Sequence, residues 1–349
     1  MKDIRMTSME RVLMTLGHKE PDKVPLFLLL SMQGAKELGL SLKDYYSKCS
    51  NVIVAQMRLK KKYKNDCLFP FYYAAIEIEA WGGSVIFIED GPVTVGEPLI
   101  KNINEVGNLE APQVKTSLAL IKVLSTIEGL KAEAGNETPI IGVVMSPLSL
   151  AVMQLGLDKF FDILYEYPDI MEKLLQKNIL FCKEWANAQL AAGATAICYF
   201  DTISSSSIIP REMYIKTGYG IAKNIFTQIN GPIATHFGSG LCGPIIDKVI
   251  ETGMSVIGVG GFDNLKVLKE QCRNKVTLLG NLNGVEMCRW KSEDAENAVK
   301  SVIKAAGKGG GLIISDGHGE IPFQVEDDIL MAISESVERW GQYPLRWVE

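Results

Sequence analysis

Short apolar runs rich in β-branched residues alternate with longer amphipathic stretches along most of this 349-residue chain, and this alternation constrains the fold most strongly. Alternating β and α segments with short connections are typical of a parallel sheet. Eight such units in one chain of this length predict an α/β fold with a single closed (β/α)8 TIM barrel. The eight predicted strands are 24–30, 67–71, 140–144, 196–200, 233–235, 256–259, 276–279 and 312–314.

Helical patterns follow these strands and indicate a single barrel domain. Examples lie at 157–184, 211–229, 244–251 and 292–306, and an additional β-hairpin is expected at 84–95, where the sequence EDGP makes a turn. We expect residues 1–20 to form a helical lead-in and residues 21–349 to form the barrel. A doubly wound open sheet is the alternative, but no GxGxxG motif follows the first strand, which disfavours it.

Two of the three histidines stand directly after predicted strands. His236 ends the segment 232–236, and His318 follows the segment 311–317. In a parallel barrel, the side chains at the carboxyl ends of the strands form the catalytic face. Histidine transfers protons near neutral pH and is a common metal ligand, so the pair predicts a metal or proton-transfer site. The alternative is that each ring only caps a strand or bonds to the backbone.

Carboxylates and a cysteine follow other strands. Asp201 comes directly after the fourth strand and either acts in catalysis or caps the serine-rich turn that follows. Glu77 and Glu79 are two positions apart, so on a helix at most one of them faces a pocket. Cys242 lies six residues after His236 and either completes a metal site or is a small buried apolar side chain.

Aromatic and thioether side chains are predicted at the same face. Phe71 and Tyr72, together with Met32 and Met145, would suit a small and largely apolar substrate such as a methoxylated aromatic. Asn281 follows the seventh strand and is a candidate polar contact to that substrate. The aromatic segment alternatively fills the core of the barrel.

Composition excludes several classes of function. The net charge is −5 and the basic triplet at 60–62 is isolated, so no nucleic-acid partner is expected. Residues 1–20 are charged throughout, and the apolar runs are too short to cross a membrane, so neither a signal peptide nor a membrane partner is expected. Seven cysteines without paired spacing are typical of a reducing compartment, and we therefore expect a cytoplasmic protein.

Motifs spread along the chain resemble those of the uroporphyrinogen decarboxylase superfamily. They keep one order and are ERVL at 10–13, PDKVP at 21–25, EIEAWG at 77–82, EDGP at 89–92, LGNL at 279–282 and GGGLIIS at 309–315. The resemblance implies a β/α barrel, in agreement with the strand count. In the decarboxylase branch, which needs no cofactor, it implies catalytic roles for Asp66 and for the segment 316–319 that contains His318.

The second branch of this superfamily consists of corrinoid-dependent methyltransferases. The paired arginines that the decarboxylase branch uses to hold propionates are absent after the first strand, where residues 31–36 read SMQGAK. The methyltransferase branch typically holds zinc with His-x-Cys after strand five and Cys after strand eight. Here His236 matches the first ligand, Gly238 replaces the first cysteine and His318 stands near the second. The resemblance thus implies zinc at His236 and His318, completed by Glu77 or Cys242.

The leading hypothesis is therefore a methyltransferase that exchanges a methyl group between a small methylated ether, amine or thiol and a corrinoid carried by a separate protein. His236 and His318 would bind zinc or protonate the leaving group, and Asp66 and Asp201 would orient these groups or the substrate. A cofactor-free decarboxylase acting on a porphyrinogen or smaller aromatic acid is the second hypothesis. A non-catalytic component of a methyl-transfer system is the third. The apolar exterior of such barrels also allows a homodimer.

Overall fold

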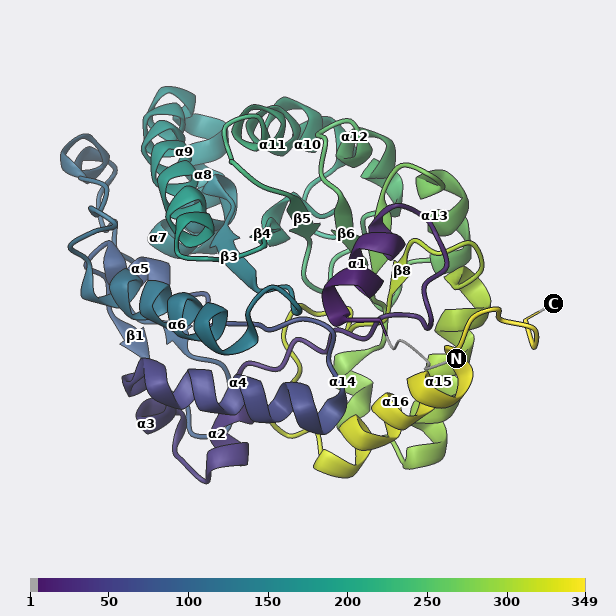
Figure 1. Ribbon diagram of the computed structural model, residues 1–349. Helices are drawn as coiled ribbons and strands as arrows, with labels where there is room; N and C mark the ends of the chain where they lie inside the picture. Colours follow the sequence, from purple (N-terminus) through teal and green to yellow (C-terminus); the bar gives the residue numbers. More distant parts are fainter. Residues whose placement is uncertain (1–5, 349) are drawn as a thin grey trace.

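Six parallel strands form the regular part of the barrel sheet in the computed structural model, which describes residues 6–348 (Figure 1). Neighbours in the sheet follow one another in the chain, so each strand returns beside the previous one through a helical crossover. The strands are β3 (Ile141–Met145), β4 (Ala196–Phe200), β5 (Ile233–His236), β6 (Val256–Gly258), β7 (Thr277–Leu279) and β8 (Leu312–Ile313). This arrangement confirms the predicted α/β barrel and its third to eighth strands.

The first two predicted strands close the barrel but are not regular strands, so that part of the prediction was wrong. Each joins a neighbour through a single parallel bridge, Leu26 to Ile314 and Leu68 to Ile140. Between them, the Asn65 side chain accepts from the Leu28 N–H and donates to the Leu28 carbonyl, at 2.9 and 3.0 Å. A side-chain amide thus replaces a stretch of the backbone ladder, which leaves the segments extended without a full strand pattern.

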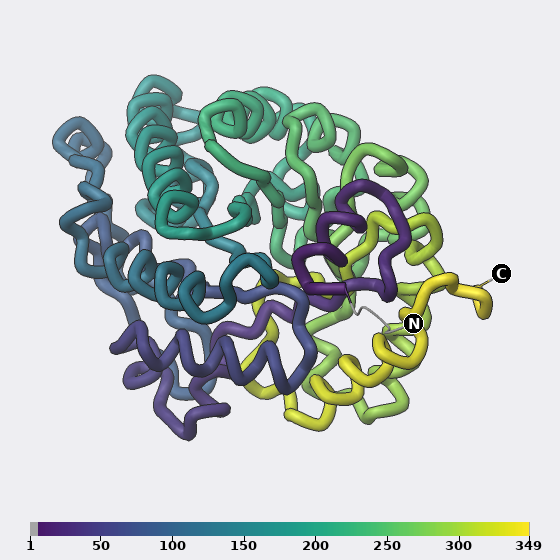
Figure 2. The backbone as a smooth tube through the Cα atoms, in the orientation of Figure 1, coloured from purple at the N-terminus to yellow at the C-terminus, as the bar shows by residue number. Residues whose placement is uncertain are grey.

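Helices form an outer layer around the sheet (Figures 1 and 2). The longest predicted helix is divided at Tyr167 because Pro168 has no N–H to continue it, and the next is divided at Thr217. The helices of this layer are α2 (Gln33–Leu38), α3 (Leu42–Ser47), α4 (Cys49–Tyr63), α5 (Ile76–Ala80), α6 (Leu118–Ala134), α7 (Pro147–Leu155), α8 (Leu157–Glu166), α9 (Pro168–Ala191), α10 (Arg211–Lys216), α11 (Gly218–Phe226), α12 (Ile246–Ile250), α13 (Leu265–Cys272), α14 (Gly284–Met287), α15 (Ser292–Ala306) and α16 (Asp327–Trp340), with short 3-10 turns η1 (Ile103–Asn108), η2 (Thr202–Ser204) and η3 (Gly243–Ile245).

The predicted hairpin is present but short. Its strands β1 (Val85–Ile86) and β2 (Thr94–Val95) pair in an antiparallel manner on either side of the predicted turn. None of the helices within residues 6–348 combines the length and the apolar character that crossing a bilayer requires.

Helix α1 (Ser8–Leu16) covers the amino-terminal end of the barrel instead of joining the outer layer (Figure 1). Thr7 and Glu10 form a capping box that starts the helix. Its apolar face, with Val12 and Leu16, closes a small apolar cavity lined by side chains of the barrel interior such as Phe27. The helix lies within the predicted lead-in 1–20, of which residues 1–5 are outside the described part of the chain.

Candidate active site

His236 is the last residue of β5 and is completely buried. Its Nδ1 accepts a hydrogen bond from the Gly238 N–H at 2.9 Å, and its ring stacks on Phe200 with centroids 5.1 Å apart. Gly258 on the adjacent strand makes room for the ring, since a Cβ there would lie 2.1 Å from the imidazole. Burial, and secondarily the nearby His318, lower the pKa of His236 to about 3, so the ring is neutral.

The proton of this neutral ring is on Nε2, because Nδ1 accepts a hydrogen bond. Within residues 6–348 no hydrogen-bond partner is found for that Nε2. A buried donor without a partner is costly in a folded protein and is therefore a place where a ligand is expected to bind. The Nε2–H of His236 is thus a buried hydrogen-bond donor at the carboxyl end of the barrel that is available to a ligand.

His318 lies in the loop after β8 and ties three of the loops at this face together. Its Nδ1 contacts the Ser239 hydroxyl, and its Nε2 lies 3.2 Å from the Asn283 side-chain oxygen. Gly284 packs against the ring, since a Cβ there would be 2.8 Å from it. The ring is half-buried, and burial lowers the pKa of His318 below its usual value. Both histidines therefore lie at the carboxyl end, as predicted.

Two buried aspartates accompany the histidines. Asp201 follows β4 and accepts a hydrogen bond from the Ser146 hydroxyl at 2.6 Å. Asp316 follows β8, and its Oδ1 accepts from the N–H groups of His318 and Gly319, both at 2.9 Å. Its Oδ2 has no partner among the described residues. Burial raises the pKa of each aspartate to about 6, so each holds its proton closer to neutral pH than an exposed carboxyl does.

Glu320 was missed by the sequence reasoning and completes an acidic cluster with Asp316. The Ser31 hydroxyl donates to Glu320, and the buried Tyr46 hydroxyl, which has no hydrogen-bond partner within residues 6–348, lies close by. Burial raises the pKa of Glu320 to about 7, and the adjacent Asp316 adds to this effect. The available signal was the spacing of Asp316, His318 and Glu320 at alternate positions after the last strand.

The four predicted metal ligands do not form one site. Glu77 on α5 accepts from the Met145 N–H at 2.9 Å, and burial raises its pKa to about 8. Cys242 packs against Asp263 with its Sγ 3.3 Å from a carboxylate oxygen, and burial raises the pKa of its thiol well above the usual value. No three His, Cys, Asp or Glu side chains in the described part of the chain are placed to hold a metal ion. The predicted zinc site therefore does not fit this geometry.

Asp66 lies at the opposite end of the barrel from the histidines. Its Oδ1 accepts from the Arg11 guanidinium at 2.5 Å and from Ser8 at 3.0 Å, and its Oδ2 accepts from the Leu26 N–H at 3.0 Å. Both members of the ion pair are buried. The prediction of a catalytic role for Asp66 was wrong, because this residue precedes its strand and holds α1 against the amino-terminal end.

The predicted substrate-binding residues are divided between the interior, the surface helices and the loops. Phe71 stacks on Phe200, and Phe200 stacks on His236, so Phe71 packs behind the aromatic ring that contacts this histidine. Tyr72 instead points outward and bonds Thr126 of α6 at 2.7 Å, so its predicted substrate contact was wrong. The remaining three stay predictions. Met32 and Met145 are buried at the carboxyl end, and the Asn281 amide donates to the Gly260 carbonyl at 3.0 Å.

Fold and site together define a parallel β/α barrel with a buried histidine and carboxyl cluster at its carboxyl end. The family model described as uroporphyrinogen decarboxylase (URO-D) matches residues 7–340, and the chain belongs to this family of enzymes. Relatives named uroporphyrinogen decarboxylase include one from Mannheimia succiniciproducens, 26% identical over 89% of this chain and 91% of the relative, and one from Magnetococcus marinus, 24% identical over 96% and 98%.

Solved structures show the same fold. A methyltransferase from Methanosarcina mazei superposes with a TM-score of 0.85 at 17% identity, covering 96% of this chain and 99% of that one. A B12-independent methionine synthase from Shewanella sp. W3-18-1 gives a TM-score of 0.54 at 13% identity, covering 92% and 95%. At sequence identities this low, the similarity to these structures shows the barrel fold alone.

Proposed function

We propose that this protein is a methyltransferase that moves a methyl group between a small methylated substrate and a corrinoid carried by a separate protein. The observation that carries the proposal is the pair of buried carboxyls at the carboxyl end, Asp316 and Glu320, whose pKa values are raised toward neutrality and which have no basic side chain as a partner among the described residues. The segments that supply these side chains, 31–35, 201–207, 236–243 and 315–325, contain neither arginine nor lysine.

A polycarboxylate substrate suits this site poorly. Uroporphyrinogen carries eight carboxylates, which require arginine or lysine donors in a buried pocket. Gln33, which stands after the first barrel segment, donates its amide to the Ile321 and Pro322 carbonyls and so is committed to the loop. The nearest cation in this part of the sequence, Lys36, lies over the Phe323 ring and donates to the Val325 carbonyl. These arrangements favour an apolar or neutral substrate over a porphyrinogen.

The cluster can supply the proton that demethylation requires. When a methyl group leaves an ether or a protonated amine, the electron pair of the broken bond stays on oxygen or nitrogen, and an anionic oxygen then takes a proton. Glu320 and Asp316 hold protons close to neutral pH, so they can donate at this stage. The Nε2–H of His236 can hold the heteroatom of the substrate by a hydrogen bond. A bound reduced corrinoid would supply the methyl-accepting centre.

Exposed apolar side chains beside His318 support docking of a partner protein. Phe262 is 76% exposed in the loop after β6, and Val285 is 55% exposed on α14. The two segments touch, because Gly261 packs against Asn283, whose side chain also contacts His318. An apolar patch at the mouth of the barrel is typical of a protein-binding surface. In this proposal it receives the corrinoid protein.

The proposal is tested by incubating the protein with chemically reduced cobalamin and a panel of methoxylated aromatics, methylated amines and thioethers. Absorbance of the methylated corrinoid is the readout, and Glu320→Gln is the matched variant. We expect transfer from one substrate class, reduced about a hundredfold in the variant, which is typical for loss of a general acid. Carbon dioxide release from uroporphyrinogen without any corrinoid would overturn the proposal in favour of a decarboxylase.

A further inference from the structure

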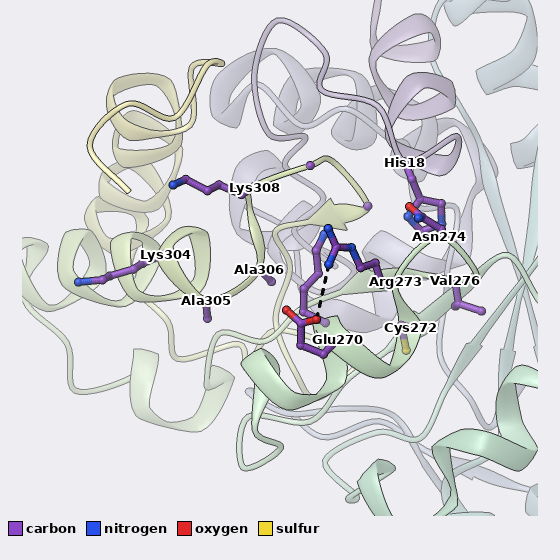
Figure 3. A pocket seen from close by; sticks show the side chains of 13 residues that line it. His18, Glu270, Cys272, Arg273, Asn274, Val276, Lys304, Ala305, Ala306 and Lys308 are labelled. Atoms are coloured by element: carbon purple, nitrogen blue, oxygen red, sulfur yellow. Dashed lines mark ion pairs between the residues drawn. The ribbon is translucent and has the colours of Figure 1, made fainter. Parts of the chain in front are cut away.

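A second cavity, of about 380 Å³, opens on the amino-terminal face of the barrel, opposite to the candidate active site (Figure 3). It lies between the end of α13, the last turn of α15, the glycine segment 309–311 that leads into β8, and His18 after α1. The connections from a helix to the next strand lie at the amino-terminal end of such a barrel. This amino-face cavity is therefore separate from the catalytic face.

The cavity is positively charged in a protein whose net charge is −5. Lys269, Arg273, Lys304 and Lys308 line it, and Glu270 is the one acidic side chain among its described lining residues. Glu270 faces Arg273 at 3.8 Å with both side chains about 70% exposed, a separation and exposure at which the pair is weak. Figure 3 shows Arg273 between Glu270 and the His18–Asn274 side, while the Lys304 and Lys308 side chains extend away from these residues.

Two basic groups inside the cavity are crowded together. Lys269 donates to the Gly310 carbonyl, and burial together with Arg273 lowers the pKa of its ammonium to about 8. Burial, and then Lys269, also lower the pKa of His18. A neighbouring positive charge destabilises the charged form of Lys269 and of His18, although Glu270 and Glu20 partly offset this for Lys269, and an anion bound beside these groups would favour their charged forms.

The backbone around the cavity is held in one conformation by close packing. Gly310 and Gly311 have positive φ values of 68° and 66°, and a Cβ on them would lie 2.3 Å from the Lys19 carbonyl and 2.6 Å from His18. Side chains other than hydrogen are therefore excluded at both positions. The cavity is a preformed feature of the fold, which lowers the entropic cost of binding a ligand.

Helix electrostatics explains only part of the charge. Lys269 and Lys304 lie in the last turns of α13 and α15, where basic side chains compensate the helix dipole. Arg273 and Lys308 lie beyond the helix ends, and Lys269 is partly buried rather than solvated. Compensation of the helix dipoles therefore explains neither the positions of Arg273 and Lys308 nor the partial burial of Lys269.

We propose that the amino-face cavity binds a small anionic ligand that carries a phosphate group. Arg273 provides a guanidinium fork that suits phosphate oxygens, and Lys269 and His18 contribute further donors from the cavity wall. The volume accommodates a phosphate together with a small organic group. Because the cavity lies on the opposite face from the histidine and carboxyl cluster, this binding is independent of the proposed methyl transfer.

The test is a titration of the purified protein with inorganic phosphate and pyrophosphate, against sodium chloride at matched ionic strength. Phosphorus NMR line broadening and the thermal unfolding midpoint report binding, and proton NMR of His18 reports the site. We expect saturable binding at one site and an increase in the pKa of His18. Arg273→Gln and Lys269→Gln each should weaken binding by about tenfold or more, as loss of a charge-assisted hydrogen bond does.

Lys266→Gln is the matched control, since Lys266 is exposed on the same helix but does not line the cavity. It removes the same charge and should leave phosphate binding unchanged. Binding that does not saturate, that chloride reproduces, or that weakens equally in the control would overturn the proposal. Circular dichroism of each variant establishes that the fold is retained.

Discussion

The two ends of the barrel place carboxyl groups in opposite electrostatic environments. At the amino-terminal end, Arg11 lies between Asp66 and Asp22, with contacts of 2.5 and 2.6 Å. At the carboxyl end, Asp316 accepts hydrogen bonds from backbone N–H groups and Glu320 accepts one from the Ser31 hydroxyl. Carboxyl groups are withdrawn from solvent at both ends of the barrel. The two ends differ because, among the described residues, only the amino-terminal end places a guanidinium, that of Arg11, beside its carboxylates.

The pKa values follow this difference. Burial alone would raise the pKa of Asp22, but its hydrogen bonds to Arg11 lower it below the usual value. Burial without a cation raises the pKa of Asp316 to about 6 and that of Glu320 to about 7. Charged, paired groups hold α1 in place at one end, whereas groups that exchange protons near neutral pH gather at the other. This separation indicates which end performs chemistry.

The largest expected effect is on stability at the amino-terminal end. Arg11→Met leaves Asp66 buried without its cation, and we expect the free energy of unfolding to fall by about 3–5 kcal/mol. Urea unfolding measures this change. Arg211→Met is the control, because the Arg211–Asp247 pair is exposed and should contribute about 1 kcal/mol or less. Equal losses in the two variants would contradict the structural role assigned to Arg11.

A comparable effect, on rate, is expected at the carboxyl end. His236→Leu removes the Nε2–H donor, because leucine has no polar group, and we expect methyl transfer to fall by about 10²-fold or more while the unfolding midpoint changes little. Cys242→Ala should leave the rate unchanged, because this thiol is bonded to Asp263. A loss of bound zinc and of activity in the Cys242 variant would contradict this expectation and would support the predicted metal site.

A smaller effect distinguishes the two ends by pH. The pKa of Asp316 is higher in the folded protein than in the unfolded chain, so its contribution to stability is present in acid and is lost as pH rises through about 6. Asp316→Asn keeps the acceptor for His318 and Gly319 but cannot ionise. We expect the variant to gain about 1–3 kcal/mol over the wild type between pH 4 and 8, at about 1.4 kcal/mol per pKa unit. Denaturant unfolding across this pH range measures the difference. Equal stability of the variant and the wild type would show that the pKa of Asp316 is not raised in the folded protein.

The smallest effect tests the outward orientation of Tyr72. Tyr72→Phe removes the hydrogen bond to Thr126 and should cost about 0.5–1.5 kcal/mol of stability. The KM for the methyl donor should not change, because the hydroxyl faces α6 rather than the site. An increase in KM without a loss of stability would instead support the predicted contact between Tyr72 and the substrate.

The sequence by itself determined the barrel and the placement of His236 and His318 at its carboxyl end. Alternating apolar runs and amphipathic stretches predict parallel strands with helical crossovers, and a residue that ends such a strand must lie at the carboxyl end. His236 and His318 follow this rule, and Asp66, which precedes its strand, lies at the other end for the same reason. These features depend on local periodicity, which is readable along the chain.

Only the tertiary structure decided which polar groups meet. Glu320 and Ser31 are 289 positions apart and come together because the first and last barrel segments close the sheet. Asn65 replaces part of a strand ladder with its side chain, and this depends on a backbone segment 37 residues away. The pKa of each carboxyl then depends on whether the closed barrel places a cation beside it. Burial and long-range pairing are properties of the assembled fold, and no local pattern specifies them.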